Sequence, residues 1–227
     1  MKTIILFGLR RSGNHYLISK ILQQYTNFVH INDTKLSYNK YDKYKNINAH
    51  TERIDEEWIG FKGVECVVIS MEDQIIDFNE LEKFNNISDC HILMLLRCPY
   101  TNLSSAWTAY RKKTTIAITT IFMWEIYAKI FINDNNLIKI LYDEYISNSE
   151  YQTKILNKIG ITEPKNLNNS HAIQWQESSF KHENKNKSRQ IYKSLNNCAC
   201  CDDKQFIELF ENTNVNILWD KIMKLRF

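Results

Sequence analysis

The first part of the chain contains the feature that most constrains the fold. The apolar run Ile4–Phe7 is followed by a loop bracketed by Gly8 and Gly13, and then by a helical pattern over residues 16–24. The chain has only 5 glycines in 227 residues, so we expect these two where φ is positive or the backbone approaches another group closely. A strand, a glycine loop and a helix in this order form a cradle in which loop N–H groups and a helix N-terminus converge on an anion.

The loop has the glycine spacing of a Walker A motif, G-x-x-x-x-G, but not the two residues that complete the motif. Asn14 and His15 stand where Walker A has Lys and Ser or Thr. The lysine that reaches the β/γ-phosphates and the hydroxyl that holds Mg²⁺ are therefore missing. Positive charge lies inside the loop instead, at Arg10 and Arg11. We interpret the loop as a phosphate site that does not depend on magnesium; the alternative is a tight turn with two solvated arginines.

Apolar runs typical of strands alternate with helical patterns along the chain. The run His91–Leu96 is continuous, as expected for a parallel strand buried on both faces. The alternation predicts the α/β class, with one domain over residues 1–227 and a central, mostly parallel sheet flanked by helices. Polar residues 33–57 are predicted to be a loop insertion, and basic residues 178–197 a second loop. The other expected strands are 27–31, 58–62 with 67–69, and 137–141; the other expected helices are 78–86, 102–111, 118–133, 149–159 and one from 203.

The composition argues against several classes of protein. The formal net charge of +3 is too small to indicate general nucleic-acid binding. No apolar run approaches the ~18–20 residues of a transmembrane helix, and the N-terminal apolar stretch is interrupted at residues 8–11, which argues against a signal peptide. The cysteines are therefore expected to be reduced, in the cytoplasm. Cys198, Cys200 and Cys201 lack a second ligand pair nearby, so we prefer a surface thiol cluster to a metal site and predict no metal.

A second candidate anion site follows the run His91–Leu96. P-loop NTPases carry an Asp at the end of such a strand, which organises the metal. Here the strand is followed by Arg97, with Pro99 and Ser105 further on. The guanidinium fork suits a phosphate, Pro99 fixes the turn, and Ser105 adds a hydroxyl from the following helix. A strand end with an ordinary salt-bridged arginine is the alternative.

In order and spacing, these motifs resemble the sulfotransferases that use 3′-phosphoadenosine 5′-phosphosulfate (PAPS). The stretch Arg11–His15 is similar to the loop that holds the 5′-phosphosulfate in that family, and Arg97, Pro99 and Ser105 match the spacing of its 3′-phosphate motif. The segments 140–145 and 158–161 are similar to later family elements. The resemblance, over roughly residues 3–163, implies a P-loop-like sulfotransferase architecture. It also implies transfer of a sulfuryl group from PAPS, without a metal, to an acceptor hydroxyl of a carbohydrate or other small metabolite.

The resemblance also implies roles for individual residues. Arg11 would lie on the phosphosulfate bridge and stabilise the leaving group. Tyr16 and Tyr142 would contact adenine, while Arg97 and Ser105 would bind the 3′-phosphate. The complete set expected to bind the co-substrate is Arg10, Arg11, Ser12, Gly13, Asn14, His15, Tyr16, Arg97, Ser105 and Tyr142.

A base for the acceptor hydroxyl should lie at the carboxyl edge of the sheet. The family places its base just after the strand that we expect to contain Lys62. Glu65 is therefore the first choice, with Lys62 stabilising developing charge and His15 and His30 as alternatives. The polar residues 33–57 and the helix around Trp107, Tyr110 and Trp124 are candidates for the lining of an acceptor cleft.

Two other functions fit parts of the pattern. One is a P-loop kinase or NTPase relative with a degenerate loop, which would catalyse phosphoryl transfer. The other is a non-catalytic nucleotide-binding protein that retains the cradle.

Overall fold

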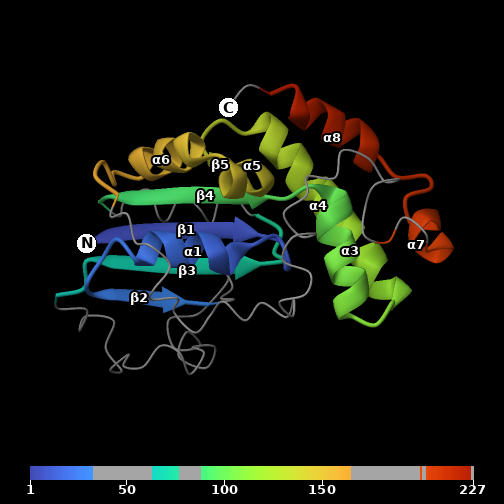
Figure 1. Cartoon of the computed structure of the whole chain (residues 1–227), viewed down its shortest axis with the longest axis horizontal. Coiled ribbons are helices and arrows are strands. Elements are labelled where there is room, and N and C mark those ends of the chain that lie inside the picture. The colour runs from blue at the N-terminus through green and yellow to red at the C-terminus, as the bar shows by residue number, and fades with distance from the viewer. Residues whose placement is uncertain (33–62, 77–87, 165–199, 201–202, 226–227) are drawn as a thin grey trace.

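A sheet of five parallel strands organises the residues that the computed structural model describes, which are 1–32, 63–76, 88–164, 200 and 203–225. The strands are arranged in the order β2-β3-β1-β4-β5, and every neighbouring pair is parallel (Figure 1). Their bounds are β1 Lys2–Gly8, β2 Phe28–Ile31, β3 Cys66–Glu72, β4 Cys90–Leu96 and β5 Ile138–Leu141. The predicted α/β class with a parallel central sheet is confirmed.

Strand β1 lies in the middle of the sheet because its side chains are apolar on both faces. Ile4 and Leu6 belong to the apolar core on one face, and Ile5 and Phe7 to the core on the other; all four are fully buried. Burial on both faces explains why the strand reads as a continuous apolar run instead of an alternating one. The register with β3 pairs Lys2 with Cys66, so these strands begin and end level with each other.

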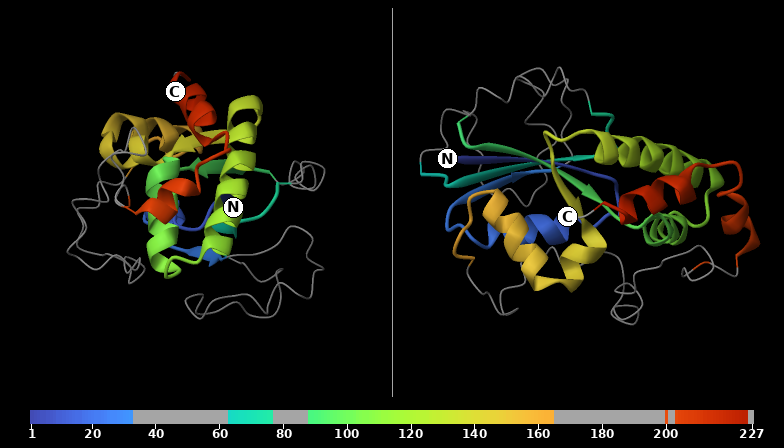
Figure 2. Two further views of the ribbon diagram at one scale, coloured as in Figure 1. Left: turned by 90° about the vertical axis from the view of Figure 1, so that its right-hand side faces the viewer. Right: turned by 90° about the horizontal axis from the view of Figure 1, so that it is seen from above.

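Helices cover both faces of the sheet. Helices α1 (Asn14–Leu22), α5 (Tyr142–Ser147) and α6 (Ser149–Lys158) pack on the face of Ile4. Helices α3 (Pro99–Ala109), α4 (Thr114–Asn133), α7 (Lys204–Glu208) and α8 (Val215–Met223) share the other core, with Ile5. Seen from above in Figure 2, α4 lies on the opposite side of the sheet from α1, α5 and α6. The fold therefore has three layers.

Helix boundaries differ from the sequence expectation mainly at their starts. Helix α3 begins at Pro99, three residues early, because proline is preorganised for the first helical position. The single helix expected from residue 203 is two helices, α7 and α8. The strand expected at 58–62, the helix at 78–86 and the loops at 33–57 and 178–197 lie outside the described residues.

Helix α4 corrects the expectation that no stretch of the chain approaches the size of a transmembrane helix. It is the one helix in the described ranges that is long enough and apolar enough to cross a membrane. A core helix passes the same test, and α4 buries Trp124, Tyr127 and Phe131 completely. Its length and composition are therefore weak support for a membrane span.

Candidate functional site

The candidate site lies at the carboxyl edge of the sheet, where β1 and β4 are neighbours. The chain leaves β1 toward β2 and leaves β4 toward β5, so the two connections diverge. Ligands bind in the crevice that such a divergence opens in parallel sheets. The glycine loop follows β1 and Arg97 follows β4, so the fold brings both predicted anion motifs to this crevice.

The loop after β1 contains residues with left-handed backbone and leads directly into the N-terminus of α1. Gly13 has a φ of 97° and Arg11 a φ of 66°, both in the left-handed region. Helix α1 begins at Asn14, and no side chain of the described residues caps it at Gly13. First-turn N–H groups without a cap carry the positive end of the helix dipole, which favours an anion there.

Asn14 holds the loop together from inside. Its Nδ2 donates to the Leu9 carbonyl at 3.1 Å and to Glu72 Oε1 at 2.9 Å, while its Oδ1 accepts from Ser12 Oγ at 3.0 Å. A Cβ on Gly8 would collide with this amide, which explains the glycine at that position. Both amide donors of Asn14 are thus used within the protein, so its backbone N–H is the group available to a ligand.

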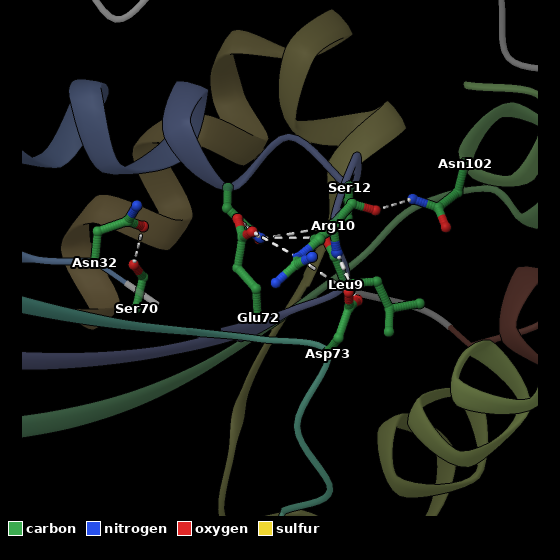
Figure 3. Close-up of polar contacts among 9 residues, drawn as sticks. Leu9, Arg10, Ser12, Asn32, Ser70, Glu72, Asp73 and Asn102 are labelled. Carbon is green, nitrogen blue, oxygen red and sulfur yellow. Dashed lines mark hydrogen bonds and ion pairs between the residues drawn. The ribbon is translucent and has the colours of Figure 1, made fainter. Parts of the chain in front are cut away.

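Arg10 points toward β3, where two carboxylates hold it. Its Nε lies 3.3 Å from Asp73 Oδ2 and 3.8 Å from Glu72 Oε2, and its backbone N–H donates to Asp73 Oδ1 at 2.9 Å (Figure 3). We expected Arg10 to bind the co-substrate. In the structure the Arg10 side chain fastens the loop to the end of β3, and its binding of the co-substrate stays a prediction.

Arg97 connects the loop to the second anion motif. Its Nη1 donates to the Arg11 carbonyl at 2.8 Å, and the guanidinium lies 5.0 Å from the centre of the Tyr142 ring. Buried Asp143 lies near it and accepts from the backbone N–H of Cys98 at 2.6 Å. Burial raises the pKa of Asp143, and the positive charge of Arg97 opposes that shift. Arg97 itself is only 7% exposed.

Arg97 and polar side chains of α3, the helix that follows it, have unused hydrogen-bonding capacity. Arg97 Nε and the hydroxyls of Ser104 and Ser105 are buried and have no hydrogen-bond partner among the described residues. Thr101 and Ser105 are one helical turn apart, so they lie on one side of α3. Asn102, beside them, donates to the Arg10 carbonyl at 3.0 Å, so this side of α3 faces the loop (Figure 3). Buried donors without partners are rare, and a bound anion would satisfy these.

Tyr16 and Tyr142 lie together above the loop. Their ring centres are 6.2 Å apart in an edge-to-face arrangement. The Tyr142 ring also covers Gly13 so closely that a Cβ at Gly13 would collide with it. The two aromatic residues predicted to contact adenine are therefore neighbours, one turn into α1 and at the start of α5.

The two histidines are also neighbours, with ring centres 6.2 Å apart. His30 Nε2 lies 2.9 Å from Ser70 Oγ, and Ser70 donates to Asn32 Oδ1 at 3.0 Å. Because the Ser70 hydroxyl proton goes to Asn32, His30 Nε2 must donate to Ser70, and neutral His30 then carries its lone pair on Nδ1. Burial, assisted by the nearby His15, lowers the pKa of His30 to about 3.

Glu65 does not lie at this edge, so its prediction as the base is wrong. It immediately precedes β3, and its Oε2 accepts from the backbone N–H of Thr26 at 2.7 Å in the turn before β2. The seven-residue length of β3, at about 3.3 Å per residue, puts Glu65 roughly 23 Å from the loop. Lys62 lies outside the described residues.

Three carboxylates at the edge were missed in the sequence. Glu72 ends β3, Asp73 follows it, and Asp143 follows β5. The signal for Glu72 was present, because an acidic residue closes an apolar strand next to the glycine loop. Recognising it required knowing that β3 pairs with β1.

The cysteines and possible metal ligands add no second centre in the described residues. Cys66, Cys90, Cys98 and Cys200 do not form disulfides. Within the described ranges, no three His, Cys, Asp or Glu side chains form a group that could hold a metal ion. Cys198 and Cys201, two members of the predicted thiol cluster, lie outside those ranges.

The sequence matches no protein-family model and no curated protein. Among solved structures, the chain is similar to mouse sulfotransferase SULT7A1 complexed with PAP, at 13% identity and a TM-score of 0.49. The match covers 99% of this chain and 89% of the mouse protein. Sequence identity this low does not transfer function, so the roles of the site residues rest on the contacts described above.

Proposed function

We propose that this chain transfers a sulfuryl group from PAPS to the hydroxyl of an acceptor, a carbohydrate or another small metabolite. The observation that carries the proposal is the 2.8 Å hydrogen bond from Arg97 to the Arg11 carbonyl, which joins the two candidate anion sites at one edge of the sheet. A nucleotide with phosphate at both its 5′ and 3′ positions needs two separated sites. A nucleoside triphosphate, whose phosphates are consecutive, needs one extended cradle.

The residues present fit such a nucleotide. The loop and the N-terminus of α1 would hold the 5′ end, with Arg11 and the first-turn N–H groups supplying positive charge. Arg97 and Ser105 would donate to the 3′-phosphate through atoms that have no partner among the described residues. Tyr16 and Tyr142 would flank the adenine. When bound, PAPS supplies the sulfuryl group and a bisphosphate that departs as adenosine 3′,5′-bisphosphate (PAP).

Glu72 replaces Glu65 as our candidate base. Its side chain is 14% exposed and is oriented at the edge by Asn14 and Arg10. Glu72 would take the acceptor proton while the acceptor oxygen bonds to sulfur and the bond from sulfur to the phosphate oxygen breaks. Arg11 would stabilise the charge that develops on that oxygen. His15, the second residue of α1, is the second candidate for the base that takes the acceptor proton.

One observation favours phosphoryl transfer as a second candidate function. Glu72 ends β3, one of the two strands beside β1, and Asp73 follows it, so carboxylates of the kind that organises Mg²⁺ in P-loop NTPases lie next to the glycine loop. Both carboxylates are engaged by Arg10, and the lysine and hydroxyl of Walker A are replaced by Asn14 and His15. We therefore rank this function second.

Transfer from labelled PAPS to a panel of hydroxyl compounds, with EDTA present, tests the proposal. Transfer that survives EDTA supports it, whereas transfer of phosphate from ATP with strict Mg²⁺ dependence supports the second candidate. PAP binding without transfer, unchanged in Glu72→Gln and His15→Asn, would indicate a non-catalytic nucleotide-binding protein. We also propose that the protein is cytoplasmic.

A further inference from the structure

A pocket of about 850 Å³ opens where α3 ends. Its described lining includes Trp107, Arg111, Lys112, Asp203 and Lys204. Three of these side chains are cations and one is a carboxylate. No described residue that the proposed function uses lines this pocket, so it is a separate feature of the surface.

Asp203, the one carboxylate in the described lining, fixes the position of one cation and leaves the lining with more cations than carboxylates. Asp203 Oδ2 lies 2.8 Å from Lys112 Nζ and accepts from Trp107 Nε1 at 3.1 Å. The Trp107 ring is buried, so it fixes the carboxylate, and the carboxylate in turn fixes the Lys112 ammonium. Lys204 Nζ lies 3.9 Å from Glu208 Oε1, so two of the three cations of the described lining face a carboxylate. Arg111 adds exposed positive charge beside the anchored Lys112, and this one net positive charge favours an anionic ligand.

Arg111 and Lys112 have unusual backbone conformations. Their φ values are 54° and 60°, in the left-handed region where glycine is favoured, and two successive residues adopt it. The Lys112 N–H donates to the Trp107 carbonyl at 2.8 Å, which holds the turn. Side chains kept at positions where glycine would be less strained are typical of functional sites.

The pocket connects to the candidate site through Tyr110. The Arg11 guanidinium lies 6.0 Å from the centre of the Tyr110 ring, and Tyr110 directly precedes Arg111. Tyr110 thus lies between the Arg11 guanidinium of the glycine loop and Arg111 of the pocket. An acceptor held at the pocket by an anionic group could extend its hydroxyl toward the loop.

We propose that this pocket binds an anionic group of the acceptor, a carboxylate or a sulfate, so that the acceptor is a negatively charged hydroxyl compound. The proposal rests on the proposed function and names its acceptor class. It predicts that Arg111 and Lys112 determine the preference for charged over neutral acceptors and have no part in nucleotide binding.

The test compares the parent with Arg111→Gly/Lys112→Gly, substitutions that the left-handed backbone accommodates. Lys154→Ala/Lys158→Ala, which removes two exposed cations from α6, is the matched control. Binding of glucuronate, glucose 6-sulfate and neutral glucose to the PAP-saturated proteins is measured by saturation-transfer NMR at low salt. We expect the parent and the control to bind one or both anionic probes at least about fivefold more tightly than glucose, the effect of one exposed charge contact. The glycine variant should lose that preference and keep its melting temperature.

Each outcome decides one question. A preference for glucuronate alone identifies a carboxylate as the anchor, and one for the sulfate alone identifies a sulfate. Equal binding of charged and neutral probes by the parent, including no binding of any probe, overturns the proposal, as does a preference that survives in the glycine variant. The rise in melting temperature caused by PAP, measured on the same proteins, should be equal in all three. Its absence from the parent would refute the proposed function, a result separate from the pocket.

Discussion

Acidification should destabilise this fold through one buried side chain, His30. The ring is 2% exposed, and its Nε2–H donates to Ser70 across the ends of β2 and β3. Burial lowers the pKa of His30 to about 3, whereas in the unfolded chain it is about 6.5. Between these values the unfolded chain binds one more proton than the folded protein. The stability is therefore fully present above about pH 6.5 and falls as the pH is lowered toward 3.

The slope follows from the proton difference. One extra proton in the unfolded state removes about 1.4 kcal/mol of unfolding free energy per pH unit, so lowering the pH from about 6.5 to 5 removes about 2 kcal/mol. In His30→Gln, the amide N–H can still donate to Ser70 but does not titrate. Comparing this variant with the parent cancels the effects of other groups, such as Asp89 and Asp203, whose pKa values lie below their usual range.

Urea unfolding of both proteins between pH 7 and pH 5 measures the effect. We expect the parent to lose about 2 kcal/mol more than His30→Gln over this interval. Equal losses would contradict the reasoning. So would an NMR titration in which the His30 ring of the folded protein protonates near pH 6.5.

Further predictions concern the loop and the chemistry. Gly13→Ala should lower the unfolding free energy by about 1–3 kcal/mol and weaken PAP binding, because its Cβ collides with Tyr142 in a left-handed backbone; unchanged thermal unfolding would contradict this. Asn14→Ala should cost about 1–3 kcal/mol, seen in urea unfolding, since it leaves the Leu9 carbonyl and Glu72 without their donor. Glu72→Gln should slow transfer about a hundredfold or more while PAP affinity, measured by calorimetry, stays within about threefold. A full rate in Glu72→Gln would exclude Glu72 as the base.

The sequence was sufficient to predict those parts of the site whose residues lie close together in the chain. The strand, the glycine loop and the start of α1 follow one another in the chain, so their pattern predicted this strand–loop–helix arrangement. The spacing of Arg97 and Ser105 is likewise set by one turn and one helix. These are the parts of the site whose relative placement depends on few residues.

The sequence was insufficient to predict the positions of site residues that depend on pairing between strands distant in the chain. Glu65 immediately precedes the seven-residue strand β3, and Glu72 is its last residue. Only the register of β3 against β1 shows which of the two carboxylates lies next to the loop. The engagement of Arg10 by Asp73 depends on the same pairing. The left-handed turn at Arg111 has no signature in the side chains, because the pattern there lacks the glycine that normally marks it.

The central claim is that this edge of the sheet holds a nucleotide by phosphates at both its 5′ and 3′ positions. Titration calorimetry with PAP and with AMP, on the parent and on Arg97→Lys, tests it most directly. Because charge-assisted hydrogen bonds contribute about 1.5–3 kcal/mol, we expect the parent to bind PAP at least about tenfold more tightly than AMP. Arg97→Lys should lose most of that preference and keep its affinity for AMP. Equal affinity of the parent for PAP and AMP would contradict the account.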